Sequence, residues 1–151
     1  MKRPTQRIKV FIDTSVLIAG VASVTGASAT VLDLCEAESI QMVISRQVLV
    51  EADRNFSAKL PALLTQFRQF MRNLAPLMVE DPPERAVARA AVLIAQKDAA
   101  ILAAAMEAEV DYLITPDKKH FLKPKVKEGI PIAICSPAEF LRIFENLWLP
   151  D

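Results

Sequence analysis

The stretch that decides the fold is Ile8-Lys9-Val10-Phe11-Ile12, which ends directly at Asp13. Its apolar, β-branched and aromatic residues predict a strand. Thr14 and Ser15 follow at once, and both residue types, like aspartate itself, favour the start of a helix. A strand that runs straight into a helix is the first unit of an alternating α/β chain, so we expect the same alternation further on.

The rest of the chain continues this alternation. The clearest helix covers residues 60–74, whose apolar side chains recur at three- and four-residue steps. Short apolar runs separated by helical segments favour parallel pairing, which predicts a three-layer α/β/α sandwich around a mostly parallel sheet of about five strands. Beyond the first strand, we expect strands at four places: residues 42–44, 77–79, 112–114 and 132–134.

Several helix ends are predicted from residues that satisfy the free backbone groups there. Ser45 is expected to cap one helix, and Asp81-Pro82-Pro83 resembles the start of another. Ser136-Pro137-Ala138-Glu139 is a capping box with proline at the first helical position. The helical region 84–109 is expected to contain two helices that meet near Asp98.

Length and composition indicate a compact globule. The 151 residues, of which 52% are hydrophobic and only three are glycine, fit a single domain spanning 1–151. No apolar run is long enough to cross a bilayer, and the start of the chain lacks the pattern of a secretory signal, so we expect a cytoplasmic protein without membrane contact. Cys35 and Cys135 form no metal or redox motif and are expected to be buried, reduced thiols.

Four acidic side chains carry the functional information: Asp13, Glu51, Asp98 and Asp117. If the apolar runs pair as parallel strands, at least two of these acids reach the edge at which open α/β sheets bind ligands. Two carboxylates ~4 Å apart repel by about 4 kcal/mol at an effective dielectric constant of ~20. Either their pKa values rise, or a hard divalent cation takes them as ligands.

Each acid also has a purely structural interpretation. Asp13 can cap a helix, and for this residue alone the helix cap and the metal ligand are equally open interpretations. Glu51 alone is expected to be a solvated surface residue. Asp98 shares the buried face of its helix, where a charge needs a partner, although a first-turn aspartate is also favoured by the helix dipole. Asp117 can cap a turn. The functional hypothesis therefore depends on the four acids together.

In order and placement, the acids resemble those of the PIN-domain family of metal-dependent ribonucleases, and the match is best to VapC-like toxins of type II toxin–antitoxin pairs. The resemblance covers nearly the whole chain. Pro116 departs from it, because glycine is common there, and proline stiffens the turn before Asp117. The similar segments are Phe11–Leu17 with Asp13, Ile44–Glu51, Lys97–Leu102 with Asp98, Asp111–Asp117, His120–Leu122 and Ile134–Leu141.

This resemblance implies hydrolysis of RNA phosphodiester bonds with Mg²⁺ or Mn²⁺ as cofactor. It implies that Asp13, Asp98 and Asp117 are metal ligands and that Glu51 completes the catalytic site. It also implies a homodimer and a cognate antitoxin protein as partners. Thr115 and Thr14 are expected to support the acids through their hydroxyl groups.

Basic residues near the acids are candidate contacts for RNA phosphates, and such contacts make binding salt-sensitive. They are Arg46, Lys118 and Lys119, with Arg54, Lys123, Lys125 and Lys127 as further candidates. A solvated loop is the alternative for the lysines. The formal net charge of zero argues against a protein that binds nucleic acid through a basic surface as a whole. His120, the single histidine, is expected to pack or to bond within a turn rather than to act as a base.

Two other functions remain open at this stage. A phosphatase of the haloacid-dehalogenase type also begins with an acid after its first strand, but it usually needs a second aspartate two residues on, where this chain has Ser15. The non-enzymatic alternative is a catalytically degenerate PIN fold that binds RNA or acts as a scaffold. The presence of all four acids disfavours it, and Pro116 keeps it open.

Overall fold

A computed structural model describes residues 7–116, 119–121 and 123–148, without the side chains of residues 97 and 148. Its strands are β1 (Ile8–Ile12), β2 (Ile40–Ser45), β3 (Leu77–Val79), β4 (Tyr112–Ile114) and β5 (Ala133–Cys135). Its helices are α1 (Thr14–Ala22), α2 (Ala27–Glu36), α3 (Arg46–Lys59), α4 (Leu64–Leu74), α5 (Glu84–Ala90), α6 (Gln96–Glu107), α7 (Pro124–Glu128) and α8 (Pro137–Trp148), and a short 3₁₀ turn, Pro61–Leu63, precedes α4.

The sheet is parallel throughout and has the order β3-β2-β1-β4-β5. This confirms the expected sheet of five strands. β1 lies in the middle, with β2 on one side and β4 on the other, so the direction in which the chain adds strands reverses between β1 and β4. In open α/β sheets, ligands bind beyond the carboxyl ends of the strands at such a reversal.

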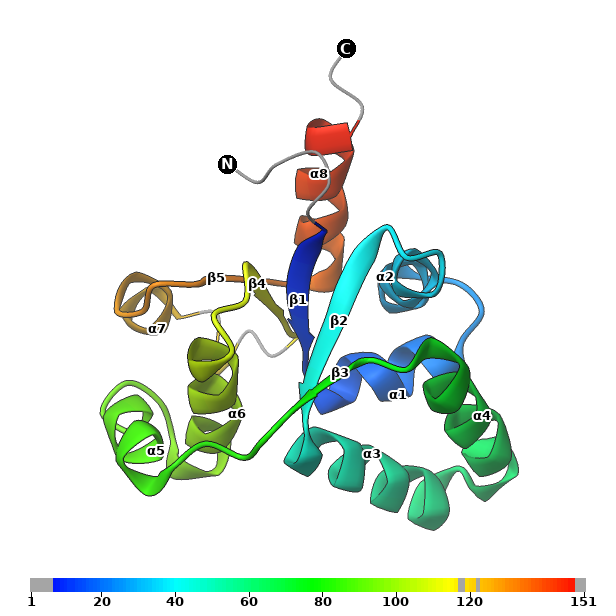
Figure 1. The fold of residues 1–151 in the computed structure, drawn as a ribbon, viewed down its shortest axis with the longest axis horizontal. Coiled ribbons are helices and arrows are strands. Elements are labelled where there is room, and N and C mark those ends of the chain that lie inside the picture. The colour runs from blue at the N-terminus through cyan, green and yellow to red at the C-terminus, as the bar shows by residue number, and fades with distance from the viewer. Residues whose placement is uncertain (1–6, 117–118, 122, 149–151) are drawn as a thin grey trace.

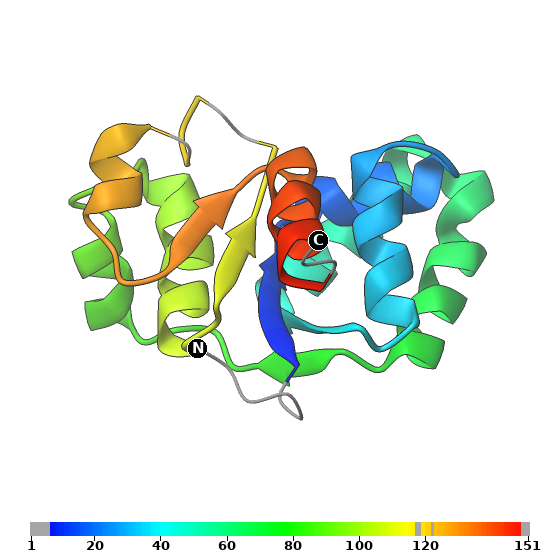
Figure 2. The same cartoon turned by 90° about the horizontal axis from the view of Figure 1, so that it is seen from above.

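Helices cover both faces of the sheet, as the expected three-layer sandwich requires. Figure 1 shows α1 to α4 on one side of the sheet and α5 to α7 on the other, and Figure 2 shows the same division from above. The last helix, α8, packs against α2. Phe11, Phe56, Phe67, Phe121 and Phe140 are the largest side chains in the core, each at most 1% exposed.

The predicted caps of two helices are present. Ser45 precedes α3, and its hydroxyl accepts a hydrogen bond from the N–H of Val48 at 3.4 Å. The capping box before α8 is complete, because Ser136 N–H donates to Glu139 Oε1 at 2.8 Å and Glu139 N–H donates to Ser136 Oγ at 3.1 Å. Both caps satisfy donors that the first turn of a helix leaves free.

The structure corrects two helix starts. The break between α5 and α6 lies at residues 91–95, earlier than expected, so Asp98 lies inside the first turn of α6 rather than at a junction. Asp81 does not cap α5, whose N-cap is Pro83. Its carboxylate instead accepts a hydrogen bond from the N–H of Gln47, in the first turn of α3, at 3.2 Å.

Cys35 and Cys135 are free and buried, as predicted. Burial raises the pKa of each thiol to about 12, and the nearby Glu139 carboxylate adds to the effect at Cys135. In the described part of the chain, no single helix is long and apolar enough to cross a membrane, and only α1 and α2 taken together, bent by 94°, meet the length and composition test.

Candidate active site

Asp13 stands at the junction of β1 and α1, and neighbouring groups fix both oxygens of its carboxylate. Oδ1 accepts a 2.8 Å hydrogen bond from the N–H of Thr14, and Oδ2 accepts a 2.7 Å bond from the hydroxyl of Thr115. The hydroxyl of Ser15 lies farther away, at 3.5 Å from Oδ2. Asp13 is therefore both the N-cap of α1 and a half-buried, oriented carboxylate, so the two sequence interpretations do not exclude each other.

Thr115 reaches Asp13 because of the sheet register. Ile12 of β1 lies opposite Ile114 of β4, so the next residues, Asp13 and Thr115, leave the sheet side by side. The N–H of Asp13 donates to the carbonyl of Ile114 at 3.1 Å and extends the ladder by one bond. The side chain of Thr115 is fully buried, and its hydroxyl is directed to Asp13 at the reversal point of the sheet.

Glu51 joins this site from α3. Its Oε2 accepts a 3.1 Å hydrogen bond from the hydroxyl of Thr14, and its Oε1 accepts a 3.0 Å bond from the side-chain amide of Gln47. Glu51 is half-buried rather than solvated, which contradicts the surface interpretation of this residue. Because Thr14 bonds to Asp13 through its N–H and to Glu51 through its hydroxyl, it connects the two carboxylates.

Asp98 lies in the first turn of α6, and its side chain is 18% exposed. Figure 1 shows that α6 runs opposite to β1, so its first turn lies toward the end of the sheet at which β1 finishes. His120 Nδ1 is 3.8 Å from Asp98 Oδ2. This contact links α6 to the segment after β4, and the sequence interpretation of His120 as a residue that packs or bonds within a turn did not include it.

The other predicted site residues divide into two groups. Asp117 and Lys118 lie outside the described residues, so their predicted roles stay predictions. Arg46, at the start of α3, and Lys119, after β4, are exposed. Both remain candidate contacts for RNA.

The donor chemistry of the site suits a hard divalent cation. Among the residues that the structure describes, no three His, Cys, Asp or Glu side chains come close enough together to hold one ion. Magnesium does not need such a group, because it dehydrates reluctantly and is usually held through one or two carboxylates while it keeps several waters. Asp13 and Glu51, joined through Thr14, supply a pair of that kind.

Sequence reasoning missed Gln47 and His120 as neighbours of the acids. Gln47 carried a usable signal, because it precedes Glu51 by four residues on the same helix, a spacing at which side chains meet. His120 carried no such signal, since its contact with Asp98 depends on how α6 packs beside β4. The structure thus adds one neutral donor and one imidazole to the predicted set.

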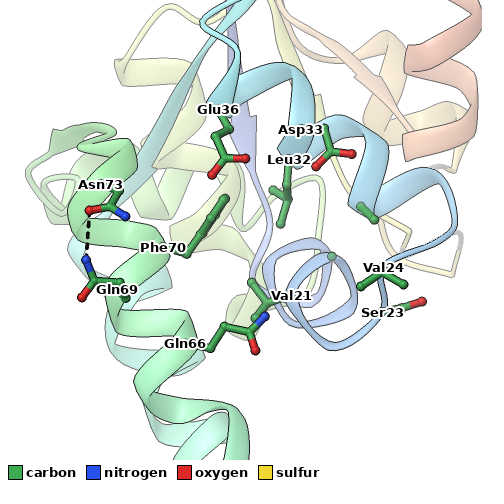
Figure 3. A pocket seen from close by; sticks show the side chains of 12 residues that line it. Val21, Ser23, Val24, Leu32, Asp33, Glu36, Gln66, Gln69, Phe70 and Asn73 are labelled. Carbon is green, nitrogen blue, oxygen red and sulfur yellow. Dashed lines mark hydrogen bonds between the residues drawn. The ribbon is translucent and has the colours of Figure 1, made fainter.

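A separate hollow of about 420 Å³ lies between α1, α2 and α4. Figure 3 shows Phe70 of α4 facing Leu32 of α2 and Val21 at the end of α1, with the carboxylates of Asp33 and Glu36 at the border. None of Asp13, Glu51 and Asp98 lines it. Six of the twelve lining residues are polar or charged, so the hollow is a groove of mixed polarity, distinct from the acidic site.

Comparison with known proteins identifies the class. The family model of the PIN domain matches residues 9–119. The chain therefore belongs to the PIN-domain family, a family of nucleases. The matched range includes the whole network formed by Asp13, Thr14, Glu51 and Thr115.

Solved structures support the same fold. The DNA-bound VapBC complex of Salmonella typhimurium contains a chain that is 18% identical, with a TM-score of 0.63 over 86% of this chain and 98% of that chain. A chain of VapBC2 from Rickettsia felis, bound to a promoter fragment, is 15% identical, with a TM-score of 0.61 over 85% and 98%. A chain of FitAcB from Neisseria gonorrhoeae is 18% identical, with a TM-score of 0.62 over 85% and 98%. No curated protein sequence matches the chain.

Proposed function

We propose that this PIN-domain protein is a metal-dependent endoribonuclease and the toxin of a toxin–antitoxin pair. The observation that carries the proposal is the network from Thr115 through Asp13 and Thr14 to Glu51. It fixes two carboxylates at the sheet edge where open α/β folds bind ligands. A network that served only to cap α1 would not need to reach Glu51 on a different helix.

PIN nucleases generally use divalent metal ions, and Mg²⁺ or Mn²⁺ is the cofactor proposed here. Asp13 and Glu51, which Thr14 connects, would hold the ion. Asp98 is not proposed as a third ligand of that ion, because no third described acid comes close enough to share it with this pair. Asp117 remains a predicted ligand outside the described residues. When bound, the ion supplies Lewis acidity that stabilises negative charge on the phosphodiester. The protein supplies orientation, because the N–H of Thr14 holds Oδ1 of Asp13 and the hydroxyl of Thr115 holds Oδ2.

RNA is the proposed substrate, and the exposed cations Arg46 and Lys119 are the proposed phosphate contacts. Lys118 belongs to the same proposal but lies outside the described residues. Contacts of this kind release counterions from the nucleic acid, so binding weakens as salt rises. An Arg46→Ala, Lys119→Ala double variant is expected to raise KM for RNA and to flatten its salt dependence, with little change in kcat.

The decisive experiment compares cleavage of structured and single-stranded RNA with Mg²⁺, with Mn²⁺ and with chelator. Asp13→Asn keeps the shape of the side chain and removes its charge, so it is expected to abolish metal-dependent cleavage. Glu145→Gln is the matched control, because it removes one exposed carboxylate from α8. Cleavage that persists in Asp13→Asn would identify a contaminant. RNA binding without cleavage in the unchanged protein would favour the degenerate, RNA-binding alternative.

The proposed partner is an antitoxin, and the groove between α1, α2 and α4 is the proposed contact surface. The solved relatives include complexes described as VapBC and FitAcB. The apolar part of the groove's lining, which includes Phe70 and Leu32, suits the apolar face of an amphipathic helix. The carboxylates of Asp33 and Glu36 favour basic residues at the border of such a helix. Phe70→Lys is expected to abolish binding of a cognate antitoxin, measured by co-purification of the two proteins, while RNA cleavage persists.

A homodimer is also proposed, following the family. Light scattering over a range of protein concentrations tests it directly. A mass that stays at that of one 16.7 kDa chain at every concentration would contradict it.

A further inference from the structure

The carboxylate of Glu51 is held at both oxygens by donors from two different helices. Thr14 of α1 donates to Oε2 at 3.1 Å, and Gln47 of α3 donates to Oε1 at 3.0 Å. We propose that Gln47 is a positioning residue, which fixes Glu51 for its part in the metal site. This inference rests on the proposed nuclease function.

Spacing alone does not carry this proposal. Gln47 and Glu51 are four residues apart on α3, and pairs at this spacing are common on helix surfaces without any function. What distinguishes this pair is the second donor, because Thr14 also bonds to Asp13. Gln47 thus holds Oε1 of Glu51, while Thr14 holds Oε2 and connects Glu51 to Asp13.

Gln47 is itself fixed in place. It lies in the first turn of α3, directly beyond the Ser45 cap and the end of β2. Its N–H donates to Asp81 Oδ1 at 3.2 Å, so a loop after β3 braces the same turn. The half-buried amide therefore reaches Glu51 from an anchored backbone, which limits the conformations that the carboxylate can adopt.

The chemistry of an amide suits this task. A neutral donor orients a carboxylate without neutralising it, whereas lysine or arginine at this position would place a positive charge where a cation is to bind. Each oxygen of Glu51 accepts one bond in the network and retains a further lone pair. Gln47 therefore leaves Glu51 able to accept a ligand or a water while its direction stays fixed.

The test substitutes Gln47 in the full-length protein. Gln47→Leu keeps the size of the side chain and removes the donor, and Gln47→Asn keeps an amide that is too short to reach. Partners that orient ligands in this way typically contribute 10–100-fold to activity or metal affinity. We expect each variant to lower kcat for RNA cleavage about 10-fold, with KM for RNA unchanged. Gln47→Lys is expected to lower kcat further, because the positive charge of lysine opposes cation binding.

Gln41→Leu is the matched control. Gln41 is equally half-buried, but it lies near the start of β2, at the end of the sheet opposite the site, and its amide bonds to the carbonyl of Met42. It should leave both kcat and KM unchanged. Thermal melts in chelator should show similar midpoints for the two leucine variants, which separates a positioning effect from a loss of fold.

A double-mutant cycle tests whether Gln47 affects cleavage only through Glu51. If Gln47 acts only through Glu51, Gln47→Leu should cost nothing further in a Glu51→Gln background. An equal loss in both backgrounds would overturn the proposal, as would normal kcat in both Gln47→Leu and Gln47→Asn. Gln47→Leu should also bind Mn²⁺ about 10-fold more weakly by calorimetry, with Mn²⁺ alone as the probe.

The calorimetric measurement also separates the two hypotheses. If the unchanged protein binds Mn²⁺ but cleaves no RNA, the proposed function fails, and the Mn²⁺ affinities of the variants still decide the role of Gln47. If the protein cleaves RNA and Gln47→Leu alters neither kcat nor Mn²⁺ affinity, the proposed function stands and the positioning role is wrong.

Discussion

The hydroxyl of Thr115 donates a 2.7 Å hydrogen bond to Oδ2 of Asp13, across 102 positions of sequence. The two residues directly follow Ile114 and Ile12, which lie opposite each other in neighbouring strands. Residues that finish adjacent parallel strands in register are brought together by the sheet itself. The orientation of Asp13 is therefore a property of the β1–β4 pairing rather than of a loop.

Removing the Thr115 hydroxyl should uncouple this pair. Thr115→Val keeps the branched shape in a fully buried position and leaves Asp13 Oδ2 without this donor. We expect about a 10-fold loss of metal-dependent RNA cleavage, measured as kcat. The net value of one hydrogen bond predicts a loss of about 1 kcal/mol in the free energy of unfolding, measured with urea. Thr115→Ser retains the donor and should keep most of the activity; equal losses in both variants would argue against the hydrogen bond as the cause.

The core packing of α3 against α4 should dominate stability. Phe67 is fully buried, and its ring stacks on Phe56 with centroids 4.7 Å apart. Phe67→Ala should lower the free energy of unfolding by about 3–5 kcal/mol, measured by urea denaturation. Val92→Ala is the contrast, because Val92 is 73% exposed and should change stability by less than about 0.5 kcal/mol. A loss below about 1 kcal/mol in Phe67→Ala would contradict this account of the core.

Both cysteines should resist thiol reagents in the folded protein. Burial raises the pKa of Cys35 and of Cys135 to about 12, so both remain protonated at pH 8, and the thiolate is the reactive form. A chromogenic disulfide reagent at pH 8 should therefore react with neither thiol until urea is added. Rapid reaction of either cysteine in native conditions would show that its segment opens.

The capping box before α8 should give a pH-dependent contribution to stability. The N–H of Ser136 lowers the pKa of Glu139 below its ordinary value of 4.5. A carboxylate with a lowered folded-state pKa stabilises the fold above its unfolded-state pKa, and this contribution is lost as the pH falls through the folded value. Glu139→Gln should therefore narrow the stability difference between pH 7 and pH 3, as measured by thermal melts.

Ser136→Ala tests the other half of the box. It removes the acceptor of the Glu139 N–H and should cost about 1 kcal/mol at neutral pH. Because the Ser136 N–H remains, the pH dependence should persist in this variant. Loss of the pH dependence in Ser136→Ala would show that the hydroxyl, rather than the backbone, controls Glu139.

Much of the fold could be predicted from local sequence. The five strands and the Ser45 and Ser136 caps are confirmed because each depends on residues close in the chain. The break at residues 91–95 could not be predicted, since the segment Ala91-Val92-Leu93-Ile94-Ala95 contains no glycine or proline. There the N–H of Val92 donates to the carbonyl of Arg89 and that of Leu93 to the carbonyl of Ala90, each three residues back rather than four, so the α-helical pattern of α5 ends. Helix α7 was also missed, because its five residues are too short for a periodic pattern.

The candidate site likewise has a part that local sequence predicts and a part that only tertiary packing determines. The sequence predicts that acids gather at the carboxyl edge of the sheet. The placement of Asp13 beside Thr115 follows from the strand order, which local sequence does not determine. The bond between Thr14 and Glu51 depends on how α1 packs against α3, and the contact of His120 with Asp98 depends on the packing of α6. Residue identity indicates which groups can take part, and only the tertiary arrangement decides which of them meet.

The central position of β1 has a consequence for the timing of synthesis. During translation, Asp13 is synthesised early, and β4 and Thr115 follow only after about a hundred more residues have been added. At elongation rates of roughly 5–20 residues per second, that interval lasts several seconds. Throughout it the growing polypeptide lacks the neighbour that orients its first carboxylate, so this arrangement can form only after the chain has been synthesised through Thr115.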